Sequence, residues 1–146
     1  MQNDIEITLA IIKPDAYSFR KVGAIISIIE ENKLNIIGAK VLKLTHERAS
    51  SFYTVHGGKD FYPKLIDFMT SGPIMTLALA GPNAVARWRE IMGPTDSAVA
   101  PEGTIRNLYG SDTRYNAVHG SDSAESAKSE LEFFFTSEEI LSLSAE

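Results

Sequence analysis

The sequence contains no cysteine, and this absence removes several kinds of chemistry. Disulfide bonds, thiolate nucleophiles and cysteine-ligated metals are excluded, and the composition fits a reducing compartment. No apolar run approaches the ~20 residues that a membrane span needs. The polar, acidic start of the chain is also unlike the basic start of a signal peptide. We therefore expect a soluble, cytoplasmic protein with no membrane association.

Two signatures of phosphate chemistry are missing as well. The chain has neither the pattern G-x-x-x-x-G-K-[ST] nor the motifs of protein kinases, so a kinase activity here would be of another type. Positive charge is scarce, because 14 Lys and Arg face 19 Asp and Glu, for a net charge of −5. This balance disfavours nucleic-acid binding through a basic surface, although it allows a local basic site.

The length and composition fit one domain that spans residues 1–146, with 44% hydrophobic residues available for a core. Apolar patterns predict four strands, at residues 5–12, 34–44, 74–80 and just before His119. Helical spacing predicts helices near residues 22–29, 45–53, 61–69, 84–92 and 122–135, and a capping box predicts a last turn at 136–139. Gly38 interrupts the second strand, which suggests a bulge.

This order of elements predicts a βαββαβ sheet with helices packed over one face. A doubly wound parallel sheet is the alternative, and it is disfavoured because no glycine-rich phosphate loop follows the first strand. Residues 93–115 show no periodicity and are rich in turn formers. A loop of this length inside a compact domain is often functional.

His119 lies at the predicted junction between a strand and a helix. Ala117 and Val118 precede it, and Ser121, Asp122 and Ser123 follow as candidate helix N-caps. Free backbone N–H groups and the positive end of a helix dipole favour an anion at such a junction. His119 is therefore a candidate base or nucleophile toward phosphate, or else a structural histidine.

Three cations from separate parts of this acidic chain accompany the histidine. Lys13 ends the first strand, Arg89 lies off the apolar face of a helix, and Arg106 lies near the end of the long loop. Alone, each could be a solvated surface residue, as we expect for His46 and His56. If the fold brings the three cations and His119 together, they form a clamp for a triphosphate. Fixed cations and a metal ion can supply much of the catalysis of phosphoryl transfer.

With these residues placed, the chain resembles the nucleoside diphosphate kinase family over nearly its whole length. The matching motifs are Ile12-Lys13-Pro14-Asp15, Ser71-Gly72-Pro73, Met92-Gly93-Pro94-Thr95, Gly103-Thr104-Ile105-Arg106 and Asn116-Ala117-Val118-His119-Gly120-Ser121-Asp122-Ser123. The resemblance implies a ferredoxin-like α/β sandwich with a four-stranded antiparallel sheet. It also implies transfer of the γ-phosphate of a nucleoside triphosphate, mainly ATP, to a nucleoside diphosphate through a phosphohistidine, which would maintain nucleotide pools.

By the same resemblance, His119 is the nucleophile, Glu130 orients its imidazole and Ser121 assists Glu130. Lys13 also belongs to the catalytic group. Mg²⁺ is expected as cofactor, held mainly by the nucleotide phosphates rather than by a metal site of the protein. Asp122 could help through water, but helix N-capping is its expected role.

The resemblance further implies a set of nucleotide-binding residues. The expected phosphate-binding residues are Lys13, Arg89, Thr95 and Arg106. Tyr53 would support the region of Lys13, and Asn116 would contact the sugar. Phe61 would stack on the base, in a slot that Leu65 lines. Because every base has a π-face, stacking implies broad use of nucleotides.

Some expectations stay open at this point. The sequence departs from the usual family pattern at residues 56–59, 62–64 and 107–115, which leaves the nucleotide preference undecided. The short C-terminus leaves a homo-oligomer built from dimers as either a tetramer or a hexamer. A catalytically weak nucleotide-binding or regulatory module would require one of the residues Lys13, Arg89, Arg106, His119 or Glu130 to be absent or misplaced, and all are present. An RNA- or DNA-binding sheet is disfavoured by the acidic balance and by the lack of a strand with alternating aromatic residues.

Overall fold

The computed structural model describes residues 5–54 and 57–141. The predictions for His56 and for the first four residues lie outside these ranges. Within them, no helix is long and apolar enough to cross a membrane.

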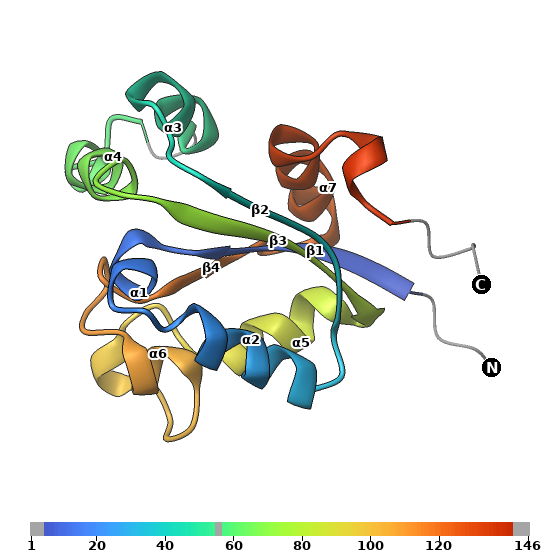
Figure 1. The fold of residues 1–146 in the computed structure, drawn as a ribbon. Coiled ribbons are helices and arrows are strands. Elements are labelled where there is room, and N and C mark those ends of the chain that lie inside the picture. The colour runs from blue at the N-terminus through green and yellow to red at the C-terminus, as the bar shows by residue number, and fades with distance from the viewer. Residues whose placement is uncertain (1–4, 55–56, 142–146) are drawn as a thin grey trace.

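A four-stranded antiparallel sheet forms the centre of the molecule (Figure 1). Its strands are β1 (Ile5–Ile12), β2 (Asn35–Leu42), β3 (Ile74–Pro82) and β4 (Val118–Gly120), in the order β2-β3-β1-β4. The central strands pair from Ile5 opposite Pro82 to Ile12 opposite Met75. The expected bulge is confirmed, because the register of β2 shifts between Ile36 and Gly38.

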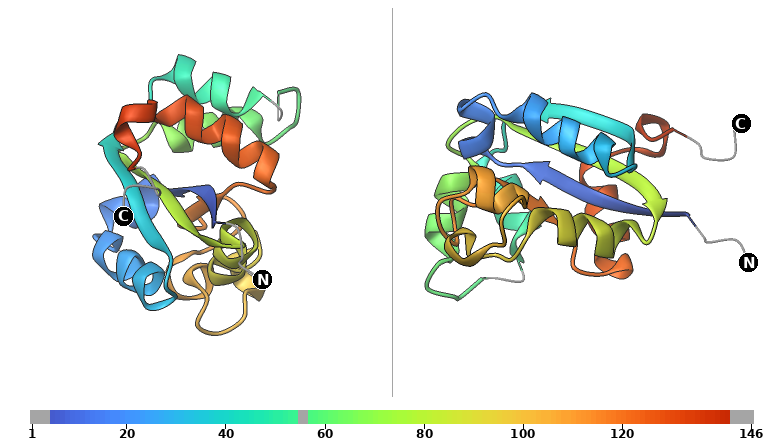
Figure 2. Two further views of the ribbon diagram at one scale, coloured as in Figure 1. Left: turned by 90° about the vertical axis from the view of Figure 1, so that its right-hand side faces the viewer. Right: turned by 90° about the horizontal axis from the view of Figure 1, so that it is seen from below.

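Helices connect and cover these strands. They are α1 (Pro14–Ser18), α2 (Val22–Glu31), α3 (His46–Phe52), α4 (Tyr62–Met69), α5 (Ala84–Met92), α6 (Ile105–Tyr109) and α7 (Ala124–Phe134), with the 3-10 turns η2 (Ser97–Val99) and η3 (Ser137–Glu139). Helices α3, α4 and α7 lie on one side of the sheet, and α2, α5 and α6 lie on the other (Figures 1 and 2).

The prediction that helices cover one face is therefore wrong, and β1 shows the physical reason. Side chains alternate between the faces of a strand. Leu9 and Ile11 enter the core with α3, α4 and α7, whereas Ala10 and Ile12 enter the core with α2 and α5. A strand that is apolar on both sides needs a helical layer on each.

Three short elements were not predicted: α1, η2 and α6. Pro14 stands in the first turn of α1, where its missing N–H costs nothing. Thr104 caps α6 by accepting a hydrogen bond from the N–H of Asn107 at 3.2 Å. The stretch 93–115 is therefore partly helical rather than an irregular loop.

Candidate active site

A cleft of about 550 Å³ opens beside the end of β4. It gathers the side chains that the sequence singled out from distant parts of the chain. All of the predicted site residues line it except Ser121, namely Lys13, Tyr53, Phe61, Leu65, Arg89, Thr95, Arg106, Asn116, His119 and Glu130. The fold therefore brings the three cations and the histidine into one cleft.

The backbone before His119 adopts a conformation that other groups must hold. Ala117 has φ +73°, and the N–H of Val118 donates to the carbonyl of Asn116 at 2.8 Å, which closes a strained γ-turn. The Asp15 carboxylate accepts from the N–H of Ala117 at 3.1 Å. A residue of α1, far away in the sequence, thus fixes the backbone at the start of β4.

Trp88 of α5 holds the backbone carbonyl of His119 itself. Its indole Nε1 donates to the carbonyl of His119 at 3.1 Å, and the ring is fully buried. The neighbouring Gly120 allows this approach, because a Cβ there would lie 2.6 Å from Cδ1 of Trp88. Together, Trp88 and Asp15 hold the backbone that carries His119.

The imidazole of His119 is oriented by a chain of two hydrogen bonds. Its Nε2 lies 3.0 Å from Oε1 of Glu130, and Ser121 Oγ donates to the same oxygen at 2.8 Å. An ionised carboxylate can only accept, so Nε2 carries the proton. The neutral ring then keeps its lone pair on Nδ1.

Burial lowers the pKa of His119 below its ordinary value. The hydrogen bond and charge of Glu130 oppose this shift, while Lys13 and Arg106 add to it. Phe52 and Tyr53 contribute to the burial, with edge-on rings centred 5.5 Å and 6.4 Å from the imidazole. The imidazole is therefore neutral, and nucleophilic, at neutral pH.

Lys13 is almost fully buried and donates to Oδ1 of Asn116 at 2.8 Å. Burial, with help from the charge of Arg106, lowers its pKa to about 7. The amide nitrogen of Asn116 donates to the carbonyls of Thr95 and Thr113, at 3.0 Å and 3.1 Å. Asn116 thus ties together both ends of the segment 93–115, and its contact with a sugar stays a prediction.

The two arginines differ in their surroundings. Arg106 is buried, and its guanidinium donates to the carbonyls of Gly93, Asn116 and Val118 at 3.0 Å, 3.3 Å and 2.7 Å. Burial and the charge of Arg89 lower its pKa to about 10. Arg89 is exposed and lines the cleft from α5. Arg106 therefore holds the loop through its hydrogen bonds, whereas Arg89 presents an exposed cation to the cleft.

Sequence reasoning missed several residues around this cleft. Phe52 and Thr113 line it, and Trp88 and Asp15 act on its backbone. Phe52 and Trp88 fall within the helices predicted near residues 45–53 and 84–92, but the sequence gave no sign of their contacts with His119. The capping role expected for Asp122 is wrong, because Ser123 is the N-cap of α7 and accepts from the N–H of Ser126 at 3.0 Å.

The donor set of the cleft does not form a metal site by itself. Across residues 5–54 and 57–141 there is no group of three or more acidic or histidine side chains that could hold a metal ion. Glu130 is already engaged, and the exposed Asp122 is the other carboxylate that lines the cleft. These residues fit a metal ion that is bound mostly by the phosphates of a nucleotide.

The fold and the cleft define a class: an α/β protein with a cleft in which three cationic side chains accompany a neutral histidine. Comparison with known proteins is more specific. The family model described as nucleoside diphosphate kinase matches residues 6–140. A nucleoside diphosphate kinase of Oleidesulfovibrio alaskensis is 50% identical over 135 residues, covering 92% of this chain and 97% of the relative. That of Persephonella marina is 49% identical over 137 residues, covering 94% and 98%.

Solved structures agree with the sequence relatives. The nucleoside diphosphate kinase of Aquifex aeolicus has a TM-score of 0.91 at 42% identity, covering 94% of this chain and 100% of that one. A halophilic nucleoside diphosphate kinase from Halobacterium salinarum, in complex with CDP, has a TM-score of 0.91 at 32% identity, covering 97% and 93%. The chain belongs to the nucleoside diphosphate kinase family. It has the ferredoxin-like fold and is an enzyme that transfers phosphate between nucleotides.

Proposed function

We propose that this enzyme moves the γ-phosphate of a nucleoside triphosphate, mainly ATP, to a nucleoside diphosphate through a phosphohistidine at His119. The observation that carries the proposal is the hydrogen bond between Nε2 of His119 and Glu130. It leaves the lone pair on Nδ1, in a cleft that Lys13, Arg89 and Arg106 also line. Such a reaction would maintain the pools of nucleoside triphosphates.

In the first half-reaction, the Nδ1 lone pair attacks the γ-phosphorus. The bond from that phosphorus to the bridging oxygen breaks, and its electron pair leaves with the diphosphate. The new N–P bond places positive charge on the ring, because Nε2 keeps its proton. The Glu130 carboxylate stabilises this charge, and Ser121 holds the carboxylate in place.

In the second half-reaction, a terminal oxygen of another diphosphate attacks the phosphohistidine. The N–P bond breaks, its electrons return to Nδ1, and a new triphosphate leaves. One site serves both halves, so ping-pong kinetics follow.

The phosphate oxygens carry negative charge throughout. Lys13, Arg89 and Arg106 stabilise it, and Thr95 binds a phosphate oxygen. A Mg²⁺ ion held by the nucleotide phosphates would neutralise part of the same charge, and Asp122, which lines the cleft, would contact it through water.

The other end of the nucleotide occupies the outer part of the cleft. Phe61 lines the cleft and is 44% exposed as a residue, which supports stacking of a base on its ring. Leu65 lines the same slot, and Tyr53 packs at the inner end near His119. Stacking accepts any base, which supports broad use of nucleoside di- and triphosphates.

Steady-state kinetics test this function. With ATP as donor and dTDP as acceptor, double-reciprocal plots at several ATP concentrations should give parallel lines. His119→Ala should abolish turnover but keep nucleotide binding, whereas the control His46→Ala, on the exposed N-terminal turn of α3, should match the wild type. Intersecting lines, or full activity of His119→Ala, would reject the phosphohistidine route. Binding without turnover in the wild type would favour a nucleotide-binding module instead.

We also propose a homo-oligomer built from dimers. In support, β2 lies at the edge of the sheet, and the part of this edge that the Leu141 N–H bond to the carbonyl of Ile37 does not use can pair with a second copy. Val41 on this strand is 54% exposed. Light scattering of the purified protein distinguishes a tetramer from a hexamer, and a monomer would contradict the proposal. The cytoplasmic location stays a prediction from the sequence.

A further inference from the structure

The slot for the base continues outward from the cleft. A second cavity of about 240 Å³ is lined by Phe61, Leu65, Thr95, Thr113 and Arg114. The first four of these residues also line the cleft of His119, whereas Arg114 does not. Arg114 therefore stands at the outer end of the slot, away from the histidine.

Hydrogen bonds to a neighbouring carboxylate hold the backbone of Arg114 in its turn. The Asp112 carboxylate accepts hydrogen bonds from the N–H groups of Arg114 and Tyr115, at 2.8 Å and 2.7 Å, and these bonds lower the pKa of Asp112. The ring of Tyr115 packs edge-on against Phe68 of α4, with centroids 4.6 Å apart. The turn is thus anchored on the helix that carries one wall of the slot.

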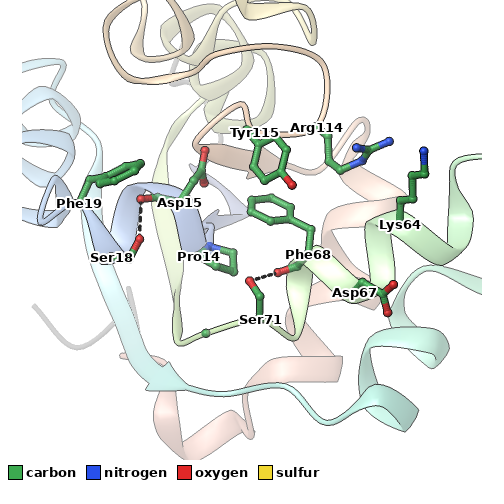
Figure 3. A pocket seen from close by; sticks show the side chains of 11 residues that line it. Pro14, Asp15, Ser18, Phe19, Lys64, Asp67, Phe68, Ser71, Arg114 and Tyr115 are labelled. Atoms are coloured by element: carbon green, nitrogen blue, oxygen red, sulfur yellow. Dashed lines mark hydrogen bonds between the residues drawn. The ribbon is translucent and has the colours of Figure 1, made fainter.

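The guanidinium of Arg114 keeps its donors available. In the part of the chain that the structure describes, no oxygen accepts a hydrogen bond from it. Arg114 and Lys64 line a neighbouring cavity, and their side chains lie on the same side of it (Figure 3). The Asp112 carboxylate, which interacts with the charge of Arg114, already accepts from two backbone N–H groups, so the guanidinium gains from an acceptor supplied by a ligand.

The orientation of the nucleotide decides which acceptor Arg114 meets. If the phosphates lie at His119, the glycosidic bond faces inward and the opposite edge of the base faces outward. That edge carries a carbonyl oxygen in guanine and uracil, and an amino group in adenine and cytosine. A guanidinium donates to the carbonyl, and to guanine it can donate twice, to O6 and N7. Toward the amino group of adenine or cytosine it presents donor against donor, so adenine offers only N7 as an acceptor where guanine offers two.

We infer that Arg114 is a specificity-determining residue, which makes this enzyme prefer guanine and uracil nucleotides over adenine and cytosine nucleotides as acceptors. The inference rests on the proposed function, because the inner position of the phosphates sets the position of the base. Stacking on Phe61 still admits all four bases, so the preference is one of degree. We expect the second-order rate constant to be about five- to tenfold higher for GDP than for ADP. This preference lies at the low end of what a bidentate arginine–guanine pair provides, because the slot is open to solvent.

The test measures how fast four diphosphates discharge the phosphorylated enzyme. The wild type, labelled beforehand with γ-labelled ATP and freed of nucleotide, is mixed with GDP, UDP, ADP or CDP at low concentration. The second-order rate constants should fall in the order GDP, UDP, then ADP and CDP together. In Arg114→Ala the four constants should come within about twofold of one another, through losses for GDP and UDP alone. The matched control Lys64→Ala removes the neighbouring exposed cation and should keep the wild-type order.

The outcomes separate this inference from the proposed function. Failure of the wild type to form the labelled enzyme rejects the proposed function, and the inference with it. If label forms but Arg114→Ala keeps the wild-type order, the inference alone is overturned. An equal loss for all four diphosphates also overturns it, because that pattern indicates stacking or a phosphate contact. Equal behaviour of Lys64→Ala and Arg114→Ala would indicate an effect of net charge and would likewise overturn it.

Discussion

Replacing Glu130 by glutamine changes the electrostatics of His119 while leaving the geometry nearly intact. Glutamine keeps an oxygen that can accept from the buried Ser121, so no hydroxyl is left unsatisfied as it would be with alanine. The negative charge beside Nε2 is lost, and the amide can also present a donor there. A donor facing Nε2 moves the ring proton to Nδ1, the atom proposed as nucleophile.

The size of the effect follows from the bond that is weakened. A hydrogen bond to a charged group contributes about 1.5–3 kcal/mol, which corresponds to roughly 10- to 150-fold in rate. We expect a loss of that size in the single-turnover rate of phosphoenzyme formation by Glu130→Gln. The dissociation constant of the nucleotide should change by less than about twofold, because in the proposed mechanism the cations, and not Glu130, bind the phosphates.

A pH profile distinguishes this electrostatic role from a structural one. Glu130 raises the pKa of His119, against the stronger lowering by burial. Removing its charge lowers that pKa further, so the acid limb of the rate moves to lower pH. The matched control is Glu132→Gln, on an exposed position of the same helix. A Glu130→Gln rate within twofold of the wild type, or an unshifted acid limb, would refute the reasoning.

Two further predictions concern the supports of the site. Trp88→Phe removes the indole donor to the His119 carbonyl but fills most of the space, so the free energy of unfolding in urea should fall by about 0.5–1.5 kcal/mol, and phosphoenzyme formation should slow. Unchanged stability and rate would show that this hydrogen bond contributes nothing. Lys13 has a pKa of about 7 in the free protein, so it is mostly neutral at pH 8, and bound phosphates should recharge it. Calorimetry at pH 8 in buffers of different ionisation enthalpy should then show uptake of about one proton per nucleotide bound, and the same uptake by Lys13→Met would exclude Lys13 as its source.

The sequence could predict the parts of the fold that local patterns determine. The alternation and apolar runs of the strands identified β1 and β3, and Thr45 was expected to begin α3, where it accepts from the N–H of Arg48 at 3.1 Å. The face that each helix covers is not a local property. It depends on the apolar side chains of β1 on both faces of the sheet, and for this reason the single helical layer was wrong.

The candidate site divides in the same way. The chemistry of Lys13, Arg89, Arg106 and His119 was visible in residue type and motif, and the fold gathers them in one cleft. The residues that hold the backbone of the site could not be predicted, because their hydrogen bonds join positions far apart in the sequence. Trp88 reaches a carbonyl 31 residues away, and Asp15 reaches an N–H 102 residues away. Arg106 shows both aspects, since its charge was expected but its three carbonyl contacts were not.

The central claim is that phosphate passes through His119, and isolation of the phosphorylated protein tests it most directly. The wild type is incubated with γ-labelled ATP and Mg²⁺, denatured in base and digested, and the labelled peptide is sequenced by mass spectrometry. The account predicts an acid-labile, base-stable phosphate on His119, which added GDP discharges before denaturation. A label on another residue, or no label on folded enzyme that still turns over, would contradict the account.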